Sequence, residues 1–132
     1  MAAHTYYFEK LDVWQNAKRL AVSIYAITEK FPSNEKFALT DQLRRSAVSV
    51  SANIAEGSTR EHLNDYVRFM NIAYGSCIEV LNHILIAKEL NYVSDSTLNE
   101  IRDQVSQITN QLRALNKSVI AKKRSNEKTQ QQ

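Results

Sequence analysis

The chain contains little glycine, proline or cysteine, and each shortage narrows the structures it can form. Its 132 residues include two glycines, one proline and one cysteine. With so few turn-forming residues, we expect long helices joined by short connections. Two glycines cannot supply a glycine-rich phosphate-binding loop. The lone Cys77 excludes an intramolecular disulfide and any Cys-x-x-Cys motif.

The sequence also lacks the segments that would direct it to a membrane or out of the cell. Its first 14 residues contain no apolar core of a signal peptide. No apolar run approaches the length of a membrane span. We therefore expect a cytoplasmic protein without a membrane partner. The length fits one domain that is large enough to bury a sizeable core.

Residue groups that are typical of enzymes are missing as well. A di-iron carboxylate site needs Glu-x-x-His pairs, and the sequence has none. Glu79 and His83 are one helical turn apart, which suits a metal pair or an ordinary contact along a helix. No serine nucleophile with a paired histidine and acid is apparent. Cys77 lies in an apolar seam, as a small buried side chain would. We expect no enzymatic activity, no cofactor and no metal.

Apolar residues recur at helical spacing in four segments of the chain. This periodicity predicts helices over residues 12–30, 35–56, 60–90 and about 94–123. Short links and the lack of a strand signal predict an all-α, antiparallel up-down-up-down four-helix bundle. We expect one domain over residues 1–123 and a flexible, polar and basic tail over residues 124–132.

The third segment, residues 60–90, is apolar over more than one stripe. Such a helix needs cover on several sides. One bundle core does not provide that cover, and apolar patches of this size usually mark interfaces. We therefore expect the protein to form a homo-oligomer.

The connection between the second and third helices contains one of the two glycines. Gly57 follows Ala55 and Glu56, where a glycine could end a helix in the left-handed conformation. Ser58 with Glu61 three residues later has the pattern of a capping box. Asn91 is expected to end the third helix in the left-handed conformation.

Three polar residues stand out on the second and third helices: Asn53, Glu56 and Glu79. Glu79 lies in the middle of the most apolar helix, where a charge must be paired or partly solvated. We expect these three residues to form a hydrogen-bonded cluster that joins the two helices. A ligand-binding or catalytic carboxylate is the alternative interpretation.

The positive charge is concentrated at the end of the chain. Residues 1–112 hold 11 basic and 13 acidic residues, whereas residues 113–132 hold six basic residues and one acidic residue. A basic end can bind nucleic acid, although cations also suit the carboxyl end of a helix. The candidate nucleic-acid-binding residues are Arg113, Lys117, Lys122, Lys123 and Arg124, with Arg44 and Arg45 as a second group.

Several short motifs together resemble one bacterial family. They are Phe8–Trp14, Leu39–Arg45, Ala52–Gly57, Gly75–Ser76 with Glu79, and Ala87–Leu90 before Tyr92. The chain resembles the four-helix-bundle proteins encoded in intervening sequences of 23S ribosomal RNA genes, which are often labelled as ribosomal proteins. The resemblance covers residues 8–93 most strongly. Many members carry proline where this chain has Ser51.

The resemblance implies an assembly and a partner. Members form homopentamers shaped as a short barrel. A related protein, the accessory variability determinant of diversity-generating retroelements, shares that architecture and is thought to bind nucleic acid and a reverse transcriptase. The chain is therefore expected to be a non-enzymatic pentameric accessory protein that binds the backbone of RNA or DNA. The alternative is a structural adaptor that docks a protein partner on its helical faces.

Overall fold

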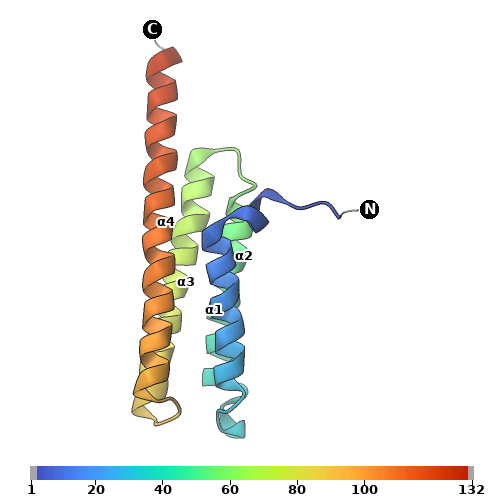
Figure 1. The fold of residues 1–132 in the computed structure, drawn as a ribbon, viewed down its shortest axis with the longest axis vertical. Helices are drawn as coiled ribbons and strands as arrows, with labels where there is room; N and C mark the ends of the chain where they lie inside the picture. Colours follow the sequence, from blue (N-terminus) through green and yellow to red (C-terminus); the bar gives the residue numbers. More distant parts are fainter. Residues whose placement is uncertain (1–2, 131–132) are drawn as a thin grey trace.

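Four long helices make up most of residues 3–130, which are the residues that the computed structural model describes (Figure 1). They are α1 (Asp12–Thr28), α2 (Leu39–Gly57), α3 (Leu63–Glu89) and α4 (Asp95–Gln130), with short 3-10 helices η1 (Tyr7–Lys10) and η2 (Ser33–Glu35). Consecutive helices run in opposite directions and pack side by side. The described residues contain no strand. The predicted antiparallel up-down-up-down bundle is confirmed.

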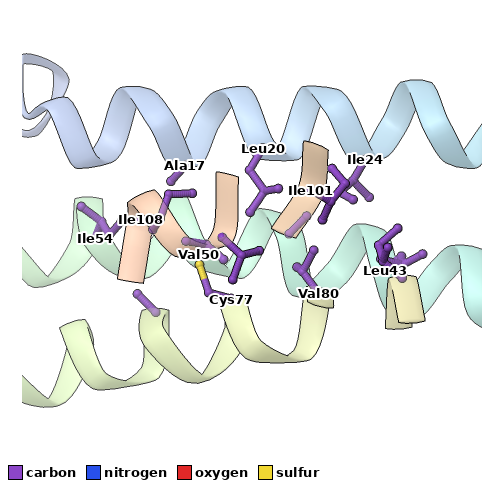
Figure 2. Packing of buried hydrophobic residues seen from close by; sticks show 14 of the residues in the cluster. Ala17, Leu20, Ile24, Leu43, Val50, Ile54, Cys77, Val80, Ile101 and Ile108 are labelled. Atoms are coloured by element: carbon purple, nitrogen blue, oxygen red, sulfur yellow. The ribbon is translucent and has the colours of Figure 1, made fainter. Parts of the chain in front are cut away.

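The core is a continuous set of apolar side chains contributed by all four helices. Leu20 and Ile24 point inward from α1, Leu43 and Val50 come from α2, and Cys77 points from α3 toward Val50 (Figure 2). All five side chains are fully buried. Burying a large aliphatic side chain contributes about 1.5–3 kcal/mol, so the seams predicted from the periodicity drive the helices together.

α3 is the most apolar helix and α4 the most polar. By length and composition alone, α3 could cross a membrane, a possibility that the sequence analysis did not anticipate. The core helix of a soluble bundle passes the same test, and one seam of α3 is indeed buried against the other helices. Apolar residues of α3 outside that seam remain exposed, among them Ile72, Ile78, Leu85 and Ile86.

The helix ends agree with the prediction at some places and differ from it at others. α2 begins at Leu39 rather than at residue 35, because residues 33–35 form the separate turn η2. At the end of α3, Asn91 adopts the expected left-handed conformation with φ 63°. At the start of α4, the Thr97 amide donates to Ser94 Oγ at 3.1 Å, as expected of a capping serine.

Gly57 has a different role from the predicted one. It is the last residue of α2, it is buried, and its φ is not positive. A Cβ built on it would lie 2.6 Å from the Cβ of Phe69 on α3. The glycine therefore allows α2 and α3 to approach closely. The capping box is also wrong: Ser58 Oγ donates to the Ala55 carbonyl at 2.7 Å, and α3 begins only after His62.

α4 continues to Gln130, past Lys123 where the sequence analysis ended the helical domain. The residues after Lys123 include no glycine or proline. Arginine, lysine, glutamate and glutamine favour helix among the polar residues, so the helix persists after its apolar seam has ended. Residues 131–132 of the proposed tail lie outside the described residues.

Candidate nucleic-acid interface

The basic residues at the end of the chain lie on one long, exposed helix. We call Arg113, Lys117, Lys122, Lys123, Arg124 and Lys128 the basic end; all six are exposed on α4. Four of them lie on one side of the helix: Arg113, Lys117, Arg124 and Lys128. Because these residues are four, seven and four positions apart, they lie within about 60° of one another around the helix axis. They form a row that can follow a line of negative charges.

The cations of the basic end are available for a ligand. Residues 3–130 contain four ion pairs, and the cations in them are Arg44, Arg45, Arg60 and Lys88. The Arg113 guanidinium lies 5.0 Å above the Tyr74 ring. A contact with an aromatic ring does not neutralise the guanidinium, so the row remains positively charged.

The turn between α2 and α3 brings further basic groups to the same end of the bundle. Arg60 and His62 line a hollow of about 390 Å³ together with Lys122 and Lys123. Sequence reasoning had not placed His62 here. The predicted bundle could have placed it, because antiparallel pairing puts the start of α3 beside the end of α4.

Tyr66 lines the same hollow with its phenol. Burial, and to a lesser extent the neighbouring Tyr7, raises the pKa of Tyr66 to about 12. The phenol is neutral at physiological pH, and the acidic residue that lines the hollow beside Lys122 and Lys123 is Glu61.

The structure does not bring Arg44 and Arg45 to the basic end. Both lie in the first half of α2, near the opposite end of the bundle. Arg44 donates to Thr28 Oγ1 at 2.9 Å, and its guanidinium lies 4.6 Å above the Tyr25 ring. Arg45 pairs with Asp41 at 3.0 Å. These arginines hold α2 to α1 and to itself, so they form a separate group.

The proposed polar cluster does not form within one chain. Glu79 is exposed, since it follows the buried Cys77 by two residues and so points about 160° away from the seam. Glu56 pairs with Arg60 at 3.1 Å instead. Asn53 donates to the Ser49 carbonyl at 2.8 Å.

A different pair of polar residues joins α2 to α3. Ser49 Oγ and Ser76 Oγ are 2.9 Å apart, which makes a hydrogen bond between the two helices. Both side chains are short, so the helices can approach while the hydroxyl groups stay satisfied. Of the predicted cluster only Asn53 takes part in this link, because its amide donates to Ser49 Oγ at 3.0 Å.

Chemistry-bearing side chains are dispersed in the described structure. Among residues 3–130, no three His, Cys, Asp or Glu side chains are grouped so that they could hold a metal ion. Burial raises the pKa of the Cys77 thiol to about 12. The thiol is therefore protonated at physiological pH, and a protonated thiol is a poor nucleophile.

The outer side of α3 carries a glycine, Gly75, in the interior of the helix. Gly75 is exposed in the middle of this 27-residue helix, and a Cβ built on it would meet nothing within 4 Å. Glycine inside a helix costs about 0.5–1 kcal/mol relative to alanine. Nothing within the described chain explains why a glycine stands here. Exposed Ile72 and Ile86 lie on the same side of the helix.

Comparison with known proteins places the chain in a family. Residues 9–114 match the family described as 23S rRNA-intervening sequence protein. A solved structure from Bacteroides thetaiotaomicron VPI-5482, a protein of unknown function from the S23 ribosomal protein family, is similar with a TM-score of 0.74. The two sequences are 23% identical, and the match covers 80% of this chain and 95% of the other. No curated protein matches. The chain belongs to the 23S rRNA-intervening sequence protein family.

Proposed function

We propose that the protein is a non-enzymatic, oligomeric accessory protein that binds the phosphate backbone of RNA or DNA through its basic end. The observation that carries this proposal is the row Arg113, Lys117, Arg124 and Lys128 on an exposed helix, outside every ion pair among residues 3–130. Phosphates attract such a row without requiring a particular base sequence.

Assembly of several copies would strengthen the interaction. The exposed apolar residues of α3 and the open surface at Gly75 favour contact with a second copy. The resemblance described above suggests five copies in a ring. Each copy would present one basic end, so modest attractions would add through multivalency.

The chemistry of the basic end favours backbone contacts over base contacts. Residues 113–129 contain no aromatic side chain on which a base could stack. Binding is therefore expected to release counterions and to weaken steeply as salt rises.

The test compares two triple variants that remove the same charge. In the first, Lys117, Arg124 and Lys128 of the row are replaced by Ala; in the control, exposed Lys10, Lys30 and Arg102 are replaced. Affinity for labelled RNA and DNA is measured by fluorescence anisotropy between about 50 and 200 mM salt. The first variant should bind more weakly at an unchanged melting temperature, and the control should bind nearly as the unmodified protein does. Failure of the unmodified protein to bind either nucleic acid at about 50 mM salt would overturn the proposal.

A second candidate function is supported by one surface feature. Phe37 is 89% exposed beside a groove of about 570 Å³ that Tyr25 and Val48 also line. Aromatic side chains with nearby arginines are common in protein interfaces. An adaptor function would use this groove for a protein partner. Recovery of a partner that survives nuclease treatment and is lost with Phe37→Ala would favour the adaptor.

A further inference from the structure

The last part of α4 rises beyond the ends of the other three helices (Figure 1), although Lys122, Lys123 and Arg124 at its base still border the start of α3 and the turn before it. Ile120 is still half-buried and borders Leu63 and Val67 at the start of α3. From Ala121 to Thr129, every residue is exposed. We call residues 121–129 the extension. At 1.5 Å per residue it is about 14 Å long.

The composition of the extension argues against a protein helix as its partner. Ala121 is its only apolar residue, so it offers no seam for a coiled coil. Its charged residues are four cations and one acid, Glu127. A helix that is polar on all sides and carries net positive charge suits a polyanion.

The cations surround the extension. Lys122, Lys123 and Arg124 are consecutive, and each step turns the helix by about 100°. Lys122 and Arg124 therefore lie on nearly opposite sides. A single strand has one backbone and can follow only one side. A duplex groove has a phosphate backbone on each wall, so both sides of the helix meet negative charge.

The diameter of the helix matches the major-groove width of only one of the two kinds of duplex, DNA and RNA. An α-helix with its side chains is about 10–12 Å across, and the major groove of B-form DNA is about 12 Å wide. The major groove of duplex RNA is too narrow for side chains to read. The side of α4 opposite the buried Leu112 carries Ala121, whose short side chain lets the groove floor approach.

From these observations, and on the basis of the function proposed above, we propose that the extension enters the major groove of double-stranded DNA. Lys122 contacts one backbone and Arg124 contacts the other, whereas Lys128 lies within about 20° of Ala121 on the side that faces the groove floor. Arg113 and Lys117 continue the second row toward the bundle and lengthen the contact with the same strand.

The first test separates helical shape from charge. Ser125→Pro keeps every charge but breaks the helix inside the extension, far from the core; Ser125→Ala is the matched control. Each protein is titrated against a labelled duplex DNA, one of its single strands and the corresponding duplex RNA. We expect the unmodified protein to prefer duplex DNA. Ser125→Pro should weaken duplex DNA binding by about tenfold, as loss of several phosphate contacts would, and should leave single-strand binding and melting temperature unchanged.

The second test measures whether Lys122 and Arg124, on opposite sides of the extension, both contact phosphates. Replacing Lys122 and Arg124 together by Ala should lower the slope of log affinity against log salt by about 1.8 on duplex DNA, because each phosphate contact contributes about 0.9. Replacing Lys10 and Arg102 is the charge-matched control and should leave the slope unchanged.

The outcomes distinguish this inference from the proposed function. Equal binding of duplex DNA and single strands, a preference for RNA, or an unaffected Ser125→Pro would overturn the groove contact while backbone binding stands. Absence of binding to any nucleic acid at about 50 mM salt would overturn both.

Discussion

The two glycines make a matched pair of test positions, because alanine at each should change stability in opposite directions. A Cβ on Gly57 would lie 2.6 Å from the Cβ of Phe69 and 3.0 Å from the Cε of Met70. The end of Met70 can move, but the Phe69 Cβ is attached directly to the backbone of α3. Gly57→Ala therefore forces α2 and α3 apart at their closest point.

The size of the effect follows from two opposing terms. Overpacking a tight contact costs about 1–3 kcal/mol, and alanine recovers at most about 1 kcal/mol of helix propensity. We expect Gly57→Ala to lower the free energy of unfolding by up to about 2 kcal/mol, the difference of these two terms. Gly75 has nothing within 4 Å of an added Cβ. Gly75→Ala should raise the stability of the isolated chain by about 0.5–1 kcal/mol.

Urea denaturation followed by helical circular dichroism measures both changes. At low protein concentration, the unfolding midpoint should fall for Gly57→Ala and rise for Gly75→Ala. An unchanged or higher midpoint for Gly57→Ala would refute the close-packing argument. If Gly75 lies in a contact between copies, its gain should shrink as the protein concentration rises, because the added methyl group disfavours assembly.

Four further substitutions test other parts of the structure. Glu79→Ala should change the stability of the isolated chain by less than about 0.5 kcal/mol, since the side chain is exposed; a larger fall in melting temperature would show that it is buried. Leu112→Ala should cost about 2–5 kcal/mol in urea unfolding, because α4 is anchored through this fully buried side chain. Arg44→Ala should cost about 1–2 kcal/mol, because it removes the bond to Thr28 and the contact with Tyr25; equal stability of Arg44→Lys would show that the guanidinium geometry is unimportant. The buried Cys77 thiol has its pKa raised from 9.0 to about 12, so its protonated form favours the folded state: this contribution is complete below pH 9 and is lost as the pH rises toward 12. Urea midpoints across that range should fall more for the unmodified protein than for Cys77→Ala.

The parts of the fold that depend on periodicity were predictable. The apolar residues that recur at helical spacing in the sequence include Leu43, Val50, Ile84 and Ile108, and each is fully buried. Spacing alone fixes which side of a helix faces inward, and it does so for all four helices. The helix ends were less predictable. At Gly57 the local sequence predicted a left-handed helix end, but the glycine instead allows α2 to pack closely on α3. This packing involves Phe69, 12 residues further along the chain, and so it cannot be predicted from the residues next to Gly57.

The candidate site was predictable only in part. Composition identified the basic end, but it could not show that α4 remains helical through these residues. Arg44 and Arg45 were predicted as a second group, and on α2 they do lie apart from the basic end; their ion pairs with Glu29 and Asp41 were not predicted. Glu79 was assigned to a polar cluster because the surrounding sequence is apolar. Glu79 is exposed because the other helices of the chain cover only one side of α3. The spacing of apolar residues along α3 does not show which of its sides stay uncovered.

The close approach at Gly57 also bears on the order in which the bundle folds. Five residues, 58–62, join α2 to α3, so closing this hairpin costs little loop entropy. The contact between Gly57 and Phe69 is local in sequence, whereas α1 and α4 meet across most of the chain. We therefore expect the α2–α3 hairpin to form early and to serve as the surface on which α1 and α4 dock. Gly57→Ala should then slow folding, whereas Leu112→Ala should mainly accelerate unfolding, a contrast that stopped-flow kinetics can measure.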